Sequence, residues 1–209
     1  MESDAFLTIK YPSEGFFKDR KSRFIGFAFP VKNEDSIKEI IKKIRKDYYD
    51  ATHRCYAYVI GKSRETYRSS DDGEQANTAG VQILGQINSR QLTNILLVVV
   101  RYYGGVKLGI PGLINAFRSA AIDTLDKTEI ITSYEKKQGV IKFQYPQMNL
   151  VMNILKDDSI EIIEQKFELD CIINFEVYSS LSTKIENQLN KTDGVSCKIM
   201  NNGIIEKTV

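Results

Sequence analysis

The chain has 209 residues and carries 29 Lys and Arg against 27 Asp and Glu, a net charge of +2 at neutral pH. This length allows one large domain or two small ones, and the charge alone does not mark a nucleic-acid-binding protein. No apolar run approaches the roughly 18 residues of a membrane span, and the first residues lack the features of a secretion signal. We therefore expect a cytoplasmic protein with no membrane partner.

The charge is unevenly distributed along the chain. Residues 1–130 contain 20 basic and 16 acidic residues, whereas the remainder contains 9 and 11. All nine arginines fall between Arg20 and Arg118. Because the planar guanidinium suits bidentate phosphate recognition, this distribution favours the first part as the anion-facing half. The alternative is that arginine is merely scarce in a sequence rich in Lys, Ile and Asn.

Two strands are expected at the start of the chain, at residues 6–11 and 16–31, because apolar side chains recur there at near-strand spacing. A basic cluster lies at the start of the second: Lys18, Arg20, Lys21 and Arg23. Such a cluster could face phosphate groups, or it could be a solvated edge of the sheet.

A helix and a third strand are expected next. Asn33 is suited to cap a helix with an inward apolar stripe. The stripe consists of Ile37, Ile40, Ile41, Ile44 and Tyr48. Residues 51–60 then resemble a strand entering the core, in which His53 and Cys55 share a face. A Cys–His pair could supply a thiolate nucleophile, but no third group that would orient it is identifiable, which favours a buried structural pair.

The densest acidic segment is residues 69–74. Asp71, Asp72 and Glu74 could hold a hard cation, although the ligand spacing of an EF-hand is absent. A turn followed by a helix over residues 78–89, with Thr78 as its N-cap, explains the same residues. That helix would bury Val81, Leu84 and Ile87.

The most informative stretch is residues 94–121. Residues 95–100 form a continuous, mostly β-branched apolar run, as expected of a strand buried on both faces in the middle of a sheet. From Pro111 to Leu125 apolar residues recur at helical spacing, and proline suits a first helical turn. These features predict a central strand followed by a helix packed on the sheet.

A glycine-rich loop joins this strand to the helix. Glycines let backbone N–H groups approach a ligand, and a helix N-terminus carries partial positive charge, so the loop predicts an anion site; the alternative is only a tight turn. The candidate anion-binding or nucleic-acid-binding residues are Arg101, Gly104, Gly105, Lys107, Gly109, Gly112, Asn115 and Arg118. Arg101, at the end of a buried strand, could instead be held by a structural carboxylate such as Asp71 or Asp72. The glycine order matches neither a P-loop nor a dinucleotide fingerprint.

Residues 126–134 are expected to lead from a first domain, residues 1–133, into a second, residues 134–209. The second shows strand signals at residues 139–145, 160–167, 169–178 and 195–201, and helix signals at 147–156 and 181–190. This β-α-β-β-α-β order is that of the ferredoxin-like split unit. Cys55, Cys171 and Cys197 lack the spacing of a zinc site or a disulfide framework, so reduced thiols are expected.

Two long motifs carry a family resemblance. Residues 70–80 (SDDGEQANTAG) and residues 99–109 (VVRYYGGVKLG), followed by Gly112-Leu113, resemble the signature of the YigZ/IMPACT family. His53-Arg54-Cys55 and residues 21–25 also fit, so the resemblance covers about residues 16–125 strongly. Gln75-Ala76-Asn77 and Ile110-Pro111 depart from the family pattern. The resemblance implies an α+β fold with a ribosomal-protein-S5-domain-2-like N-terminal domain, a C-terminal domain like those of elongation factor G, and a role in translation.

Two functional hypotheses follow. The first is a non-catalytic protein without a cofactor that binds RNA or the ribosome and regulates translation. The second is an enzyme acting on a phosphorylated small molecule, with phosphate at the glycine loop and a metal at the acidic turn. Fold similarity does not decide between them, because one fold serves many functions. The sequence does not indicate an oligomeric state.

Overall fold

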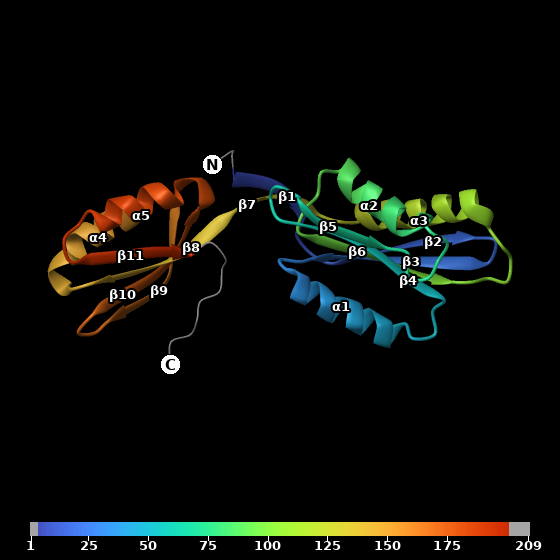
Figure 1. Ribbon diagram of the computed structural model, residues 1–209, viewed down its shortest axis with the longest axis horizontal. Helices are drawn as coiled ribbons and strands as arrows, with labels where there is room; N and C mark the ends of the chain where they lie inside the picture. The colour runs from blue at the N-terminus through green and yellow to red at the C-terminus, as the bar shows by residue number, and fades with distance from the viewer. Residues whose placement is uncertain (1–3, 201–209) are drawn as a thin grey trace. The chain divides into compact units, whose positions relative to one another are not determined.

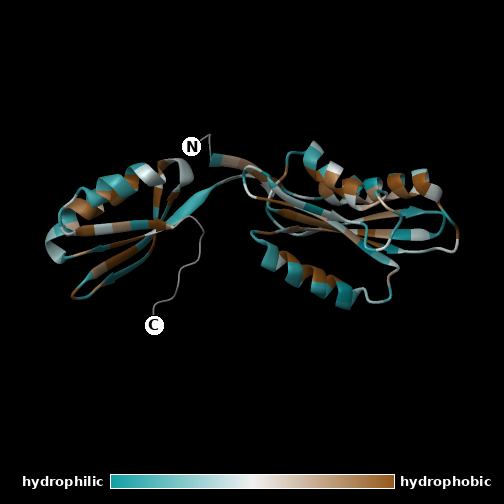
Figure 2. Ribbon diagram, in the orientation of Figure 1, coloured by the Kyte–Doolittle hydropathy of each residue, from teal (hydrophilic) through white to brown (hydrophobic). Residues whose placement is uncertain are grey.

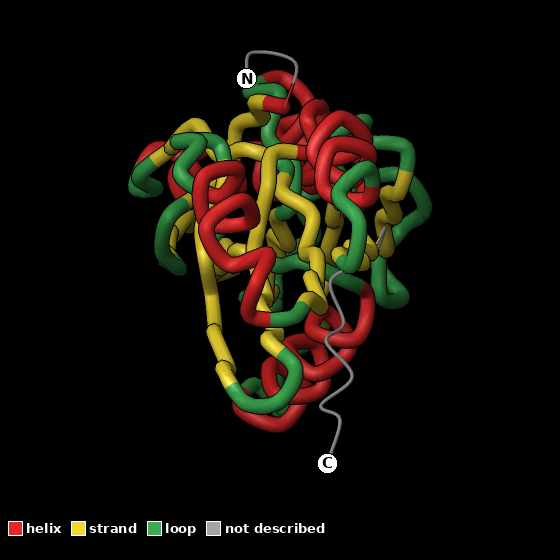
Figure 3. Tube along the Cα trace, turned by 90° about the vertical axis from the view of Figure 1, so that its left-hand side faces the viewer, coloured by secondary structure: helices red, strands yellow, loops and turns green. Residues whose placement is uncertain are grey.

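A computed structural model describes residues 4–200 of the chain. The architecture is α+β, with helices and strands throughout (Figure 3). The chain divides into two compact units, one from Phe6 to Ser133 and the other from Tyr134 onward together with Asp4 and Ala5 (Figure 1). Within the described residues, no helix has both the length and the apolar character needed to cross a membrane.

The first unit is built on a five-stranded antiparallel sheet. Its strands, in spatial order, are β2 (Ser13–Asp19), β3 (Ser22–Pro30), β6 (Ile95–Tyr102), β4 (His53–Ile60) and β5 (Thr66–Ser70). Figure 1 shows α1 (Glu34–Asp47) on one face and α2 (Gly80–Ser89) with α3 (Gly109–Asp126) on the other. The prediction of a central strand followed by a packed helix is confirmed.

Two apolar layers enclose β6, whose hydrophobic residues lie along the centre of the sheet (Figure 2). Leu97 and Val99 belong to the cluster formed with α2 and α3, whereas Val98 and Val100 belong to the cluster formed with α1. The alternation follows from the strand period of two, and burial on both faces explains why the run contains no polar position before Arg101.

The expected strand at residues 16–31 is instead a hairpin of β2 and β3. The turn is made by Arg20 and Lys21, whose φ angles are 42° and 67°. Hairpin turns with two positive-φ residues match the twist of the strands but usually contain Asn or Gly, so an Arg-Lys pair carries no turn signal. β5 was also not predicted, because its residues are largely polar and exposed.

The predicted N-cap residue is confirmed for α1 and is wrong for α2. The side chain of Asn33 accepts the N–H of Ser36 at 2.9 Å, as predicted. Thr78 does not cap α2, because its hydroxyl donates to the carbonyl of Gln75 at 2.6 Å. The helix begins at Gly80 and turns Ile83 and Ile87 into the core.

Val81, expected inside that helix's core face, is 46% exposed, and Leu84 only packs against the margin of the core. The prediction of Ile87 as a buried residue is confirmed, whereas the buried residue one turn before it is Ile83 rather than Val81 or Leu84.

The second unit has the predicted order of elements. The strands are β8 (Lys136–Phe143), β9 (Ile160–Phe167), β10 (Cys171–Tyr178) and β11 (Val195–Met200), and the helices are α4 (Met148–Leu155) and α5 (Ser182–Asn190). The sheet order is β11-β8-β10-β9, with every neighbouring pair antiparallel. Every second residue of β10 is buried, in one core cluster with residues of both helices.

The segment expected to lead out of the first domain is a strand. β7 (Ile130–Tyr134) pairs with β1 (Ala5–Ile9), and β8 begins two residues after β7 ends. No extended linker therefore lies at residues 130–137. Cys55, Cys171 and Cys197 are all buried and free, in agreement with the expectation of reduced thiols.

Candidate functional site

The glycine loop between β6 and α3 packs against the turn between β2 and β3. A Cβ atom added to Gly104 would lie 2.1 Å from the carbonyl carbon of Lys21 and 2.3 Å from the nitrogen of Ser22. The N–H of Gly104 donates to the Oγ atom of Ser22 at 3.1 Å, and Ser22 is fully buried. Glycine is needed at position 104 because no side chain fits so close an approach. Two regions that were separate candidates in the sequence are therefore adjacent.

Exposed cations gather where the turn meets the loop. Arg20 and Lys21 form the tip of the turn, Lys107 lies in the loop, and all three are exposed. None of them forms an ion pair within residues 4–200. Lys18 is also exposed, whereas the guanidinium of Arg23 lies 4.9 Å from the ring centroid of Tyr102.

The start of α3 adds backbone donors to this region. The helix begins at Gly109 and has no side-chain cap, so its first N–H groups are not bonded to a capping side chain. Uncapped N–H groups and the helix dipole favour an anion there. The loop and the first turn of α3 also expose apolar surface at Tyr103, Val106 and Ile110, which are 47%, 42% and 48% exposed.

Arg101 differs from the other candidates because it is buried. Only 5% of the residue is exposed, and its guanidinium forms an ion pair with Glu74 rather than with Asp71 or Asp72. The guanidinium carbon also lies 5.6 Å from the ring centroids of Phe24 and of Tyr103. Its charge is therefore neutralised inside the protein, and its Nε atom has no hydrogen-bond partner among the residues that the structure describes.

The acidic turn is held by protein donors. Asp71 accepts the N–H groups of Ala79 at 3.1 Å and Gly80 at 2.8 Å, and so acts as the cap of α2. Asp72 accepts the N–H of Arg54 at 2.9 Å and the guanidinium of Arg45 at 2.9 Å.

The carboxylates of Asp71, Asp72 and Glu74 thus have different partners. Among the described residues, no group of three or more His, Cys, Asp or Glu side chains is arranged to hold a metal ion. The geometry does not support the alternative of a metal site at this turn, because the carboxylates cap a helix and pair with arginines.

His53 and Cys55 also contact this turn. The thiol of Cys55 donates to the carbonyl of Asp71 at 3.0 Å, and a ring nitrogen of His53 lies 3.0 Å from the carbonyl oxygen of Asp72. Burial, and then the negative charge of Glu74 and the two aspartates, raises the pKa of the Cys55 thiol. A nucleophilic cysteine needs the opposite shift, so the environment is that of a structural residue.

Asn115 and Arg118, predicted to share a helix face, are both exposed on α3. Arg118 is directed toward α2, because its guanidinium donates to the side-chain oxygen of Gln82 at 3.0 Å. Gln82 in turn donates to the carbonyl of Asn77 at 3.2 Å. Of the predicted residues, the structure therefore brings together the glycine loop and the basic cluster, while Arg101 and Arg118 have protein partners.

Comparison with known proteins gives consistent matches. Residues 20–125 match the family described as the Impact N-terminal domain. The IMPACT family member YvyE of Bacillus subtilis is 32% identical over 174 residues, which are 83% of this chain and 79% of that protein. YigZ of Escherichia coli is 30% identical over 151 residues, covering 71% of this chain and 74% of the relative. A crystal structure of a hypothetical protein shares 25% identity and a TM-score of 0.70 over 98% of this chain and 99% of that chain. The chain therefore belongs to the IMPACT family.

Proposed function

We propose that this protein binds structured RNA or the ribosome through the surface formed by the β2–β3 turn and the glycine loop, and that it regulates translation in this way without catalysing a reaction. The observation that carries the proposal is the contact at Gly104. It places Lys21 beside the loop that contains Lys107, although 86 positions separate the two lysines in the sequence.

The electrostatics of this surface suit a polyanion. Arg20, Lys21 and Lys107 have no acidic partner among residues 4–200, so binding a phosphate there breaks no internal ion pair. Each lysine or arginine that neutralises a phosphate releases condensed counterions, which is the main sequence-independent contribution to nucleic-acid affinity. The N–H groups at the start of α3 add donors for the same phosphates.

Membership of the IMPACT family supports the assignment to translation, because the resemblance of the two long motifs implies that role. We also infer that the first unit is of the ribosomal-protein-S5-domain-2 type and that the second is ferredoxin-like. The antiparallel sheet order β11-β8-β10-β9 supports the second assignment, since it follows from the split β-α-β unit.

The enzymatic alternative required a metal at the acidic turn. Asp71 and Asp72 instead bind backbone N–H groups, and Glu74 pairs with Arg101. A metal would have to displace these bonds and leave a buried arginine unpaired, which is costly. The geometry therefore favours the binding protein.

The experiment is a fluorescence titration of a labelled RNA hairpin and of purified ribosomes at several salt concentrations. Lys21→Ala and Lys107→Ala should each weaken binding and reduce the slope of log affinity against log salt by about 0.7–0.9. Lys42→Ala is the matched control, because Lys42 is an exposed lysine of α1, which covers the face of the sheet opposite to α3 (Figure 1). If both loop variants bind as the control does, the surface is not the binding site.

A further inference from the structure

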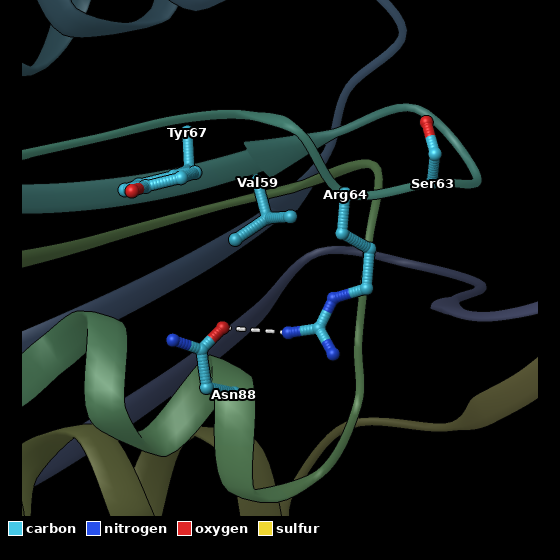
Figure 4. A pocket seen from close by; sticks show the side chains of 5 residues that line it. All are labelled: Val59, Ser63, Arg64, Tyr67 and Asn88. Carbon is cyan, nitrogen blue, oxygen red and sulfur yellow. Dashed lines mark hydrogen bonds between the residues drawn. The ribbon is translucent and has the colours of Figure 1, made fainter.

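A pocket lies between the β4–β5 hairpin and the C-terminal end of α2 (Figure 4). Its volume is about 440 Å³, within the range of small-molecule sites. It is lined by Val59, Ser63, Arg64, Tyr67 and Asn88. No residue of the glycine loop or the acidic turn belongs to this lining.

One wall of the pocket is formed by the paired strands β4 and β5. Val59 on β4 and Tyr67 on β5 are directly paired across the two strands, so their side chains share a face of the sheet. Tyr67 is 63% exposed, because β5 is an edge strand. Val59 is only 1% exposed and closes the pocket from below, so the exposed ring of Tyr67 is the surface on which a planar ring can stack.

The opposite side of the pocket presents a cation with unused donors. Arg64 has a left-handed backbone, with φ of 60°, and extends from the hairpin loop toward α2 (Figure 4). One of its terminal nitrogens donates to the side-chain oxygen of Asn88 at 2.6 Å, and its buried Nε atom has no partner within residues 4–200. A guanidinium carries several N–H donors in a planar fork that suits carboxylate or phosphate.

The backbone carbonyls at the end of α2 are hydrogen-bonded to the backbone that follows the helix. The carbonyl of Ile87 already accepts the N–H of Leu92 at 3.1 Å, and the carbonyl of Asn88 accepts the N–H of Gln91 at 3.0 Å. The Asn88 contact uses one of the five N–H donors of the guanidinium, which leaves terminal donors available to an anion. The Asn88 contact also fixes the guanidinium in place before any ligand arrives.

We propose that this pocket binds a molecule in which a planar ring is joined to an anionic group, with the ring on Tyr67 and the anion on Arg64. A nucleoside monophosphate has this chemistry, either free or as one unit of an RNA chain. The site is separate from the glycine loop. Val59 pairs with Ile95 at the start of β6, whereas the loop follows the other end of that strand, which is about 20 Å away at the usual rise per residue.

The test is isothermal titration of the whole chain with adenosine monophosphate, adenosine, ribose 5-phosphate and a short unstructured RNA. Arg64→Gln and Tyr67→Ala should each weaken binding of the nucleotide about tenfold, because each removes one of two contacts. Arg68→Gln is the matched control, since Arg68 pairs with Tyr58 and therefore lies on the other face of the same strands. Adenosine and ribose 5-phosphate should each bind about tenfold more weakly than the intact nucleotide.

The proposal would be overturned if adenosine monophosphate did not bind. It would also be overturned if Arg64→Gln and Tyr67→Ala left the affinity for this nucleotide unchanged. Equal binding of ribose 5-phosphate and the nucleotide would overturn the role of the ring. If the RNA binds more tightly than the nucleotide and both variants weaken RNA binding, the natural ligand is a nucleotide unit of RNA. If the RNA and the nucleotide bind with equal affinity, the natural ligand is a free nucleotide. Lys107→Ala should leave the nucleotide titration unchanged, so failure of the glycine-loop proposal is distinguishable from failure of this one.

Discussion

Removing Glu74 should destabilise the first unit strongly. The Glu74 and Arg101 side chains are 9% and 7% exposed, so Glu74→Ala leaves an unpaired guanidinium inside the protein. Its Nε atom already lacks a partner in the part of the chain that the structure describes. Breaking one side of a buried ion pair costs roughly 3–5 kcal/mol. We expect about 3 kcal/mol, because the rings of Phe24 and Tyr103 retain part of the stabilisation of the cation. For a folding unit of this size that corresponds to a fall in Tm of about 10 °C.

Urea denaturation followed by circular dichroism measures this loss of unfolding free energy. A double-mutant cycle isolates the contribution of the Glu74–Arg101 ion pair. The double variant Glu74→Ala with Arg101→Met should be more stable than Glu74→Ala alone, because it no longer buries an unpaired charge. Glu129→Ala is the control, since it removes an exposed pair with Lys10 and should cost less than about 1 kcal/mol. A loss for Glu74→Ala as small as that of the control, or no gain in the double variant, would refute the reasoning.

Three further outcomes are expected. Gly104→Ala should cost about 1–3 kcal/mol in urea denaturation, because its Cβ would overlap the β2–β3 turn, whereas Gly85→Ala in the open part of α2 should stabilise by about 0.5–1 kcal/mol; similar values for both would contradict the close contact. The thiol of Cys55 should resist alkylation at pH 8 in the folded protein and react after unfolding, since burial raises its pKa; rapid labelling of the folded protein would show that it is accessible. A hydrogen bond from Lys127 lowers the pKa of Asp123, so its stabilising contribution is present at neutral pH and is lost as the pH falls below the ordinary value of 3.8. The difference in unfolding free energy between wild type and Asp123→Asn should therefore shrink in acid, and a difference that grows would reverse the assignment.

Much of the first unit could be predicted because its strongest signals are local. The apolar run of β6 and the helical period of α3 reflect burial along one segment, which the order of residues records directly. The cap of α1 was predictable for the same reason, since Asn33 and Ser36 are three residues apart. Pattern reasoning succeeds where the interacting groups are neighbours in the chain.

The errors occur where the partner is distant or the residue type is unusual. The carboxylate that caps α2 comes from Asp71, eight and nine residues before the N–H groups it accepts, so Thr78 was the nearer but wrong choice. The partner of Arg101 lies 27 positions away, and several nearby acids matched the requirement equally well. The turn at Arg20 and Lys21 has positive φ angles but contains neither Asn nor Gly, so its sequence does not indicate a turn.

These pairings also decide which charges of the motifs are available to a ligand. The sequence predicts Arg101, Lys107 and Arg118 around one glycine loop, with a structural carboxylate as the alternative partner of Arg101, and the structure gives Arg101 a carboxylate and Arg118 an amide oxygen. Lys107 keeps its full charge exposed, and the contact at Gly104 adds Lys21 to it from another strand. Because a cation that already has an internal partner gains less from a phosphate than one exposed to water alone, the anion affinity of this end of the sheet should depend on the two lysines far more than on either arginine.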